Sequence, residues 1–284
     1  MSSKTFHGGI HPKEYKELTE NLAFETFPFP DEIILPLSQH LGKESKSLVK
    51  KGEDVKPGQM IAQAEGFVSA PVHSSVAGKV MSLGKEHTSS GFPKDSIVIK
   101  RNGTVESENI LLEPLNTETI TPDEIRERVA LAGIVGQGGA AFPTSVKLSP
   151  PKDKRIDVVI LNGCECEPYL TRDYRFMIER PDDLISGLKL IMKALGVNRG
   201  VIGIEDNKPE AIELLLNKVK YEHGLEVVSL KTKYPQGAEK MLIKAVTGKE
   251  VPPGKLPMDV GAVIQNIGTA IAIHDAIVKG EVLI

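Results

Sequence analysis

The chain has 284 residues, enough for about two domains, and 40% of them are hydrophobic, which excludes intrinsic disorder as its main state. Its 35 Lys and Arg against 38 Asp and Glu leave a net charge of -3. No overall basic field therefore attracts nucleic acid or an anionic membrane, and any anion site must be local. The two cysteines, Cys164 and Cys166, are too close in sequence for a disulfide-stapled scaffold, which favours a reducing compartment.

Residues 31–103 are predicted to form a small all-β domain. Short β-branched segments such as residues 97–99 alternate with turn residues such as Pro57. The sequence GEDVKPGQMIA followed by SSVAGKV resembles the barrel-sandwich of biotinyl and lipoyl carrier domains. Those carriers present a lysine at the hairpin tip, but no lysine occurs between Lys56 and Lys79. We therefore expect a structural β module without a covalently attached group.

The β module is flanked by two further segments, of which residues 104–120 show no clear periodicity. Residues 1–30 are interpreted as an N-terminal extension and residues 104–120 as a connector. The sequence TPDE at residues 121–124 is a capping box with proline at the first helical position. It predicts a helix that runs to about Ala132 and stops at Gly133.

Beyond this helix the chain alternates strands and helices. The apolar patterns predict strands over residues 156–161, 200–204 and 225–230, a further apolar run over 260–264, and helices over 181–195, 208–223 and 238–246. This order is typical of a parallel sheet with helices on both faces. Residues 121–284 are therefore predicted to be an α/β domain with a Rossmann-like parallel sheet flanked by helices, preceded by the biotinyl/lipoyl-like β module.

The first candidate functional segment is GQGGAAFPTSVK at residues 136–147. Glycine lets the backbone approach a ligand, and a helix beginning near Thr144 would favour a phosphate, to which Lys147 adds a charge. The spacing differs from the GxGxxG fingerprint of dinucleotide-binding folds. From spacing alone, a tight structural turn and a phosphate cradle are equally supported.

The second segment, LNGCECEPYL at residues 161–170, falls at the carboxyl end of a predicted strand, where open α/β sheets bind ligands. Asn162 and two nearby carboxylates can hydrogen-bond ribose, ribityl or ring edges, so a functional interpretation is favoured. The two cysteines could be metal ligands or a redox dithiol. Since the chain has no other cysteine and its histidines are scattered, apolar packing is favoured and no metal site is expected.

Two further segments follow the last two predicted strands. KYPQGAEK at residues 233–240 offers Tyr234 for stacking on a ring, although such a segment alone is more often a plain turn. QNIGT at residues 265–269 carries side-chain amides that more often cap a helix than bind a ligand.

In content and order these segments resemble the C subunit of the Rnf electron-transport complex. The stretches that carry the resemblance are GGIHP (8–12), PLSQHLG (36–42), VSAPVHSSVAGKV (68–80), GIVGQGGAAFPTSVKL (133–148), LNGCECEPYLTRDYRFM (161–177), YPQGAEKMLI (234–243) and QNIGTA (265–270). The α/β part is also similar to the flavin- and NADH-binding subunit of respiratory complex I.

The resemblance implies FMN as cofactor and NAD(H) as substrate. The implied FMN-binding residues are Gly136, Gly138, Gly139, Lys147, Asn162, Glu165, Tyr234, Gly237, Glu239, Gln265, Asn266 and Thr269. The implied NADH contacts are Phe142, Glu167 and Glu239. No catalytic acid or base is named, because hydride transfer between stacked rings needs none. The chain departs from the complex I pattern at Gln137, Cys164, Ala238 and Leu148, where that pattern has Arg, Asp, Glu and Trp.

The implied function is electron exchange between NAD(H) and bound FMN in a membrane-associated ferredoxin–NAD oxidoreductase coupled to ion transport. A flavin is needed because NADH gives two electrons as hydride, whereas iron–sulfur centres accept one at a time. The implied partners are the other Rnf subunits, NADH and, indirectly, ferredoxin, with no nucleic acid. Attachment to the cytoplasmic face of the membrane is expected through partner subunits, because no segment of the chain is predicted to span a bilayer.

Members of this family continue into a β-grasp segment and a ferredoxin-like domain with two four-iron (4Fe–4S) clusters. The sequence here stops before them, so we expect a truncated chain that accepts hydride from NADH at best. The alternative function is a non-catalytic scaffold that retains the fold and docks neighbouring subunits, similar to the related quinone-reductase A subunit. A covalent carrier is disfavoured because the tip lysine is absent.

Overall fold

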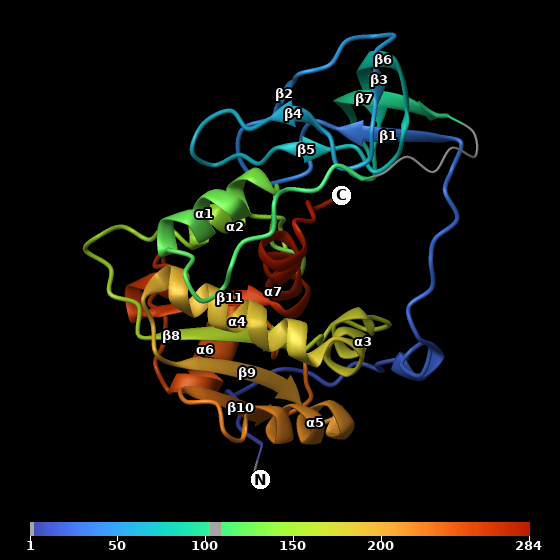
Figure 1. Ribbon diagram of the computed structural model, residues 1–284. Coiled ribbons are helices and arrows are strands. Elements are labelled where there is room, and N and C mark those ends of the chain that lie inside the picture. The colour runs from blue at the N-terminus through green and yellow to red at the C-terminus, as the bar shows by residue number, and fades with distance from the viewer. Residues whose placement is uncertain (1–2, 103–108) are drawn as a thin grey trace. The chain divides into compact units, whose positions relative to one another are not determined.

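The computed structural model describes residues 3–102 and 109–284, and residues 103–108 of the β-module end and connector lie outside this range. The chain forms two compact units, each described here by itself. The α/β unit consists of Met1–Glu25 and Leu148–His274, and the β unit of Thr26–Lys147 and Asp275–Ile284. Figure 1 labels the elements of both.

The α/β unit is built on a four-stranded, fully parallel sheet (Figure 1). Its strands, in the order β10-β9-β8-β11, are β8 (Val158–Gly163), β9 (Gly200–Glu205), β10 (Leu225–Leu230) and β11 (Ala262–Asn266). All six residues of β9 are buried, as expected for a parallel strand covered on both faces. The predicted α/β class is therefore confirmed.

Helices cover both faces of this sheet. They are α3 (Arg172–Glu179), α4 (Pro181–Leu195), α5 (Pro209–Val219), α6 (Glu239–Thr247) and α7 (Ile267–His274). A Cβ added at Gly200 would meet Leu188 and Met192 of α4, whereas one added at Gly203, three residues along the same strand, would meet Leu242 of α6. Because side chains alternate along a strand, α4 and α6 lie on opposite faces.

Several predicted boundaries differ from the structure. β8 and β11 each end two residues later than predicted, so Asn162 and Asn266 lie within strands rather than after them. α5 ends at Val219 instead of His223, because residues 220–223 offer no buried apolar side chain to hold another turn on the sheet. α4 matches its predicted range and ends at Gly196, which has the left-handed φ of 65°.

The β unit contains two antiparallel sheets. The first sheet has the strand order β1-β7-β6-β3. Its strands are β1 (Glu32–Pro36), β7 (Pro93–Arg101), β6 (Gly78–His87) and β3 (Asp54–Val55). The second sheet, in the order β2-β4-β5, consists of β2 (Lys46–Ser47), β4 (Met60–Gln63) and β5 (Val72–His73). Ile61, Val80, Ile97 and Ile99 form the centre of its core. This confirms the predicted small all-β domain.

Within the described residues, two α-helices and the π-helical segment Asp275–Lys279 also belong to the β unit. α1 (Pro122–Leu131) begins with the predicted capping box, in which Thr121 and Glu124 exchange side-chain-to-backbone hydrogen bonds. α2 (Thr144–Lys147) follows the glycine-rich segment and is a single turn. The sequence predicted a helix beginning near Thr144 whose N-terminus would attract a phosphate. A single turn has few aligned peptide dipoles, so the positive partial charge at its N-terminus is much smaller than that of a longer helix.

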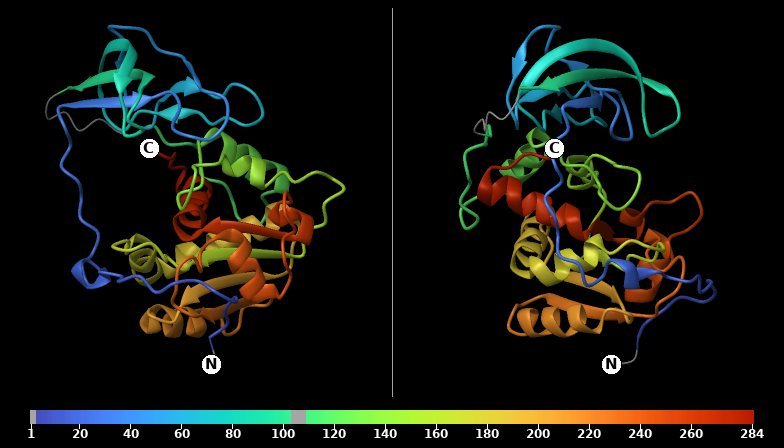
Figure 2. Two further views of the ribbon diagram at one scale, coloured as in Figure 1. Left: turned by 180° about the vertical axis from the view of Figure 1, so that it is seen from behind. Right: turned by 90° about the vertical axis from the view of Figure 1, so that its right-hand side faces the viewer.

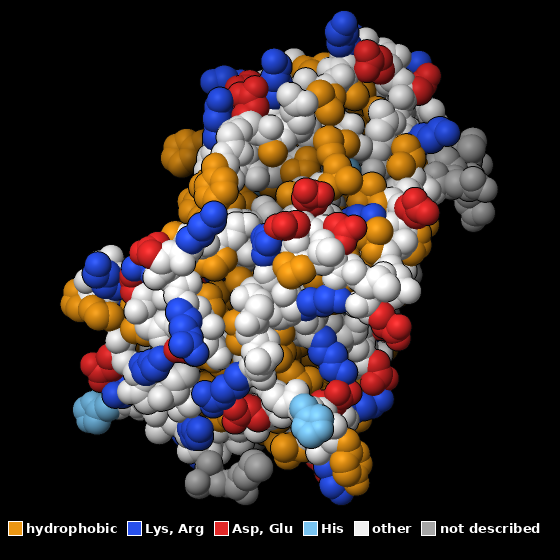
Figure 3. Space-filling view, turned by 60° about the vertical axis from the view of Figure 1, so that its left-hand side comes forward, with side chains coloured by type: hydrophobic (Ala, Val, Ile, Leu, Met, Phe, Trp, Pro, Cys, Tyr) orange, Lys and Arg blue, Asp and Glu red, His pale blue; other side chains and the backbone are white. Residues whose placement is uncertain are grey.

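The molecular surface carries mixed charge. On the face shown in Figure 3, basic and acidic side chains lie interspersed rather than gathered by sign. Within residues 3–102 and 109–284, no helix combines the length and hydrophobicity that crossing a bilayer requires.

Candidate functional site

The candidate site lies where the order of the parallel sheet reverses. β8 comes first in the chain; β9 and β10 extend the sheet on one side of it and β11 on the other. Asn162 at the end of β8 stands beside Asn266 at the end of β11 in the strand register. Such a reversal separates the loops that leave the two strands, and ligands of open α/β folds bind in the crevice outside it.

Asn162 links the end of β8 to residues 233–240. Its Nδ2 donates to the carbonyl oxygen of Gly237 at 2.7 Å, and its Oδ1 accepts from the Cys164 amide at 3.2 Å. A Cβ on Gly237 would lie 3.3 Å from both Cys164 Cβ and Cys166 Sγ. Glycine therefore eases the close approach of the two loops, since a Cβ here would press on both cysteines. One Nδ2 hydrogen of Asn162 satisfies Gly237, and the amide has a second donor for a ligand.

Asn266 fixes the start of α7. Its Oδ1 accepts from the Gly268 amide at 2.8 Å and from Arg172 Nη2 at 3.1 Å, and its Nδ2 donates to Asp173. Asn266 therefore has the helix-capping role that the sequence favoured for these amides. Thr269, the third residue of α7, is fully buried.

Gln265 differs from Asn266 in that its side-chain nitrogen has no hydrogen-bond partner among the described residues. The side chain is only 2% exposed, and its Nε2 has no hydrogen-bond partner within the part of the chain that the structure describes. An unsatisfied buried amide costs about 1–3 kcal/mol, so such a group calls for an explanation. Its place near the end of β11, beside the reversal of the sheet, makes a bound ligand one such explanation.

Glu165 caps helix α3 across the loop. Its Oε1 accepts from the Asp173 amide at 2.7 Å and its Oε2 from the Tyr174 amide at 3.4 Å. Two effects raise the pKa of Glu165 to about 7: burial, which is the larger, and repulsion from the Asp173 carboxylate. The carboxyl group therefore changes protonation near neutral pH.

The remaining predicted residues of the α/β unit vary in exposure. Glu167 is exposed, Tyr234 is half-buried before the cis peptide to Pro235, and Glu239 is half-buried at the first position of α6. These residues come from the same two segments as Asn162 and Gly237.

The cysteines are held as neutral thiols. Burial raises the pKa of both Cys164 and Cys166. Cys164 is fully buried, while Cys166 Sγ accepts from the Gly237 amide at 3.4 Å. Both are free, and this environment gives neither of them thiolate character.

The glycine-rich segment belongs to the β unit. The Gly136 amide donates to the Phe142 carbonyl at 2.9 Å, which closes the intervening residues into a tight loop. A Cβ on Gly139 would meet no atom within 4 Å. No described neighbour therefore requires glycine at this position. Gly136, Gly138, Gly139, Phe142 and Lys147 lie in the β unit, and the other predicted site residues lie in the α/β unit.

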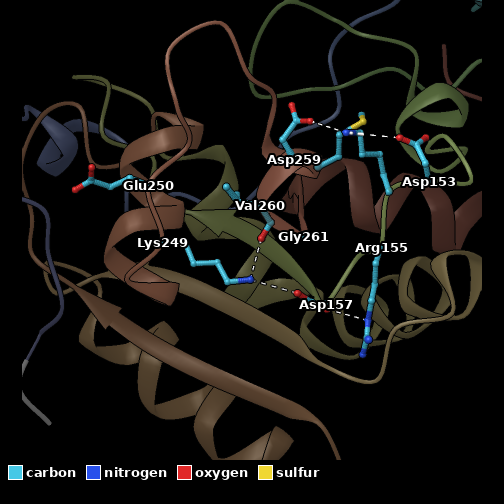
Figure 4. Close-up of a pocket in the computed structure, with 10 residues that line it drawn as sticks. Asp153, Arg155, Asp157, Lys249, Glu250, Asp259, Val260 and Gly261 are labelled. Atoms are coloured by element: carbon cyan, nitrogen blue, oxygen red, sulfur yellow. Dashed lines mark hydrogen bonds and ion pairs between the residues drawn. The ribbon is translucent and has the colours of Figure 1, made fainter.

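A hollow lined by charged residues lies at the opposite, amino-terminal ends of β8 and β11 (Figure 4). Its charges neutralise one another: Lys249 pairs with Asp157 at 3.2 Å, and Lys154 with Asp259 at 2.9 Å. We assign no ligand to it.

Lys16 was not among the residues predicted from the sequence. This buried side chain donates from Nζ to the carbonyl oxygens of Glu165, Glu167 and Leu170. The nearby stretch GGIHP at residues 8–12 is part of the family resemblance, and it is the feature of the sequence that pointed to this segment.

Two family models match the chain. Residues 129–275 match the Nuo51 FMN-binding domain, and residues 4–104 match the RnfC barrel sandwich hybrid domain.

Curated relatives extend the similarity over nearly the whole chain. The C subunit of the proton-translocating ferredoxin:NAD(+) oxidoreductase complex of Clostridium ljungdahlii is 49% identical, covering 99% of this chain and 61% of the relative. The C subunit of the Na(+)-translocating complex of Acetobacterium woodii is 47% identical, covering 97% and 62%. The C subunit of an ion-translocating oxidoreductase complex of Rhodobacter capsulatus is 42% identical, covering 100% and 55%. The chain thus spans less than two thirds of the length of each.

Proposed function

The chain belongs to the family of Rnf complex C subunits, and on this premise we propose that it holds FMN and exchanges electrons between NAD(H) and that flavin. The observation that carries the proposal is the placement of Asn162 beside Asn266 where the parallel sheet reverses, with Asn162 bonded to the Gly237 carbonyl. This is the position at which open α/β sheets bind nucleotide-like ligands.

Two features of the chain fit a flavin mononucleotide. None of the residues that the structure describes accepts from the buried Gln265 Nε2, and the carbonyls and hydroxyls of a flavin supply an acceptor. The open space beside Gly139 lets a backbone amide approach a phosphate without a side chain in the way.

We assign distinct roles to the two sets of residues. Ring and sugar contacts fall to residues of the α/β unit, namely Asn162, Glu165, Tyr234, Gly237, Glu239, Gln265, Asn266 and Thr269. Phosphate contacts fall to Gly136, Gly138, Gly139 and Lys147, and dinucleotide contacts to Phe142, Glu167 and Glu239. The flavin, when bound, accepts hydride and releases electrons singly. The chain's own residues bind and orient the rings, and none acts as a general acid or base.

The wider role follows from the relatives. We propose that the chain acts within an ion-translocating ferredoxin–NAD oxidoreductase, with the other Rnf subunits as partners and ferredoxin as an indirect one. Partner subunits provide the attachment to the membrane. With two cysteines this chain does not supply the four ligands of a 4Fe–4S cluster, so we propose that the clusters implied by the resemblance lie outside it.

A fluorescence titration with FMN tests the site. We expect saturable quenching by the wild-type chain and an affinity at least about tenfold lower for Asn162→Ala, which loses an amide donor. Asn217→Ala is the matched control, because Asn217 is exposed on α5. If the wild type neither quenches FMN nor gives heat in calorimetry, the scaffold function replaces this proposal.

A further inference from the structure

The N-terminal strap, defined here as residues 4–16, is part of the α/β unit (Figure 2). Lys4 pairs in parallel with Leu230 of the edge strand β10. Farther along, Ile10 and Tyr234 exchange two backbone hydrogen bonds of 2.8 Å. The strap thus passes from the sheet edge to the segment that carries Tyr234 and Gly237.

Lys16, the last residue of the strap, makes three hydrogen bonds through its side chain. Its ammonium group donates to three carbonyl oxygens, those of Glu165 at 2.8 Å, Glu167 at 3.1 Å and Leu170 at 2.7 Å. An ammonium has three donors, so one loop uses all of them. The Lys16 side chain is buried, so its ammonium is shielded from water, which strengthens these bonds.

The loop held by Lys16, residues 164–170, has an unusual backbone. Glu165 and Tyr169 have φ values of 54° and 67°, in the left-handed region that L residues rarely adopt. Such conformations persist only where the surroundings enforce them. The strap restrains this loop in two ways. Lys16 bonds three of its carbonyls, and the Tyr169 amide donates to the Glu14 carbonyl at 2.8 Å.

The strap also holds the second site segment, residues 233–237. Lys233 Nζ donates to the Gly8 carbonyl at 2.8 Å, and its ammonium lies over the Phe6 ring. A Cβ on Gly9 would lie 2.9 Å from the Tyr234 carbonyl oxygen, so the strap and this segment are in close backbone contact. The strap therefore ties together the two segments that Asn162 and Gly237 join.

We propose that Lys16 is a positioning residue for the flavin site, acting through the backbone carbonyls of residues 164–170. The inference rests on the proposed function for its effect on FMN, but its structural step is independent of any ligand. Removing the ammonium leaves three partly buried carbonyls without this donor, and the loop loses the restraint on its left-handed residues.

Hydrogen exchange without flavin tests the structural step. In Lys16→Ala we expect amides of residues 164–170 to exchange about tenfold faster or more than in the wild type, while those of α4 and β9 keep their protection. Lys51→Met is the control, because Lys51 is an exposed lysine in a turn of the β unit. Unchanged exchange across residues 164–170 in the folded variant would overturn the proposal.

Chemical rescue separates positioning from general destabilisation. n-Propylammonium matches the part of Lys16 that alanine lacks, so it should restore loop protection and FMN affinity in Lys16→Ala, whereas neutral 1-propanol should not. Without rescue, FMN affinity should be about tenfold lower, which corresponds to about 1.4 kcal/mol. Equal effects of the amine and the alcohol would contradict the proposal.

A second variant covers a failure of Lys16→Ala to fold. Lys16→Arg keeps the charge but presents a planar, longer donor group, so it should fold and exchange faster than the wild type in the same loop. Wild-type exchange for Lys16→Arg would count against the proposal. If the wild-type chain binds no FMN, the proposed function fails, while the exchange results still decide the role of Lys16.

Discussion

Gly187→Ala is expected to destabilise the α/β unit by about 3 kcal/mol, the upper part of the range for overpacked cores. Gly187 lies in α4 against α7, and a Cβ there would come within 2.0 Å of the Ala270 carbonyl oxygen. The clash involves backbone, so no side-chain rotation relieves it and the two helices must separate. The gain of about 1 kcal/mol in helix propensity offsets only part of this cost.

Urea unfolding of Gly187→Ala, followed by circular dichroism, measures the effect. Gly84→Ala is the matched control, because Gly84 is exposed in β6 and its added Cβ would meet nothing within 4 Å. We expect the control to change the free energy of unfolding only slightly. Wild-type stability for Gly187→Ala would show that α4 and α7 are not packed as described.

Gly139→Asp is expected to leave the stability of the chain unchanged and to lower its affinity for FMN by at least about a hundredfold. A Cβ at Gly139 meets no atom, and its φ lies outside the left-handed region, so the fold accommodates a side chain. If the loop approaches the flavin phosphate, the new carboxylate repels it by about 4 kcal/mol at a separation of about 4 Å near the surface.

Titration of Gly139→Asp with FMN and with riboflavin checks this. Riboflavin lacks the phosphate, so its affinity should fall far less than that of FMN. Gly84→Asp adds the same charge at another open glycine and should change neither affinity. Equal losses for FMN and riboflavin would contradict a phosphate contact at this loop.

The sequence predicted those parts of the fold that depend on local pattern. The spacing of Leu184, Leu188 and Met192 and the glycine at position 196 were enough to place both ends of α4. Helix α3 was not predicted, because its cap is Glu165, a side chain seven residues before the helix begins. That contact exists only after the loop has folded.

In the site, too, residues placed by local sequence pattern could be predicted, whereas those placed by contacts formed only on folding could not. The residues at the strand ends could be found because the carboxyl edge of a parallel sheet is predictable from strand order, and Asn162 and Asn266 do stand side by side. Lys16 could not, because its partners are backbone carbonyls about 150 residues away, which leave no mark in composition or periodicity. Its burial is likewise a property of the folded strap.

Electron exchange between NAD(H) and bound FMN is tested most directly by adding NADH, without oxygen, to the chain loaded with FMN. We predict that the oxidised flavin absorbance of the protein-bound FMN bleaches, much faster than that of free FMN at the same concentration, as hydride passes from NADH to the flavin. Protein-bound FMN that stays oxidised in excess NADH would contradict the proposed function.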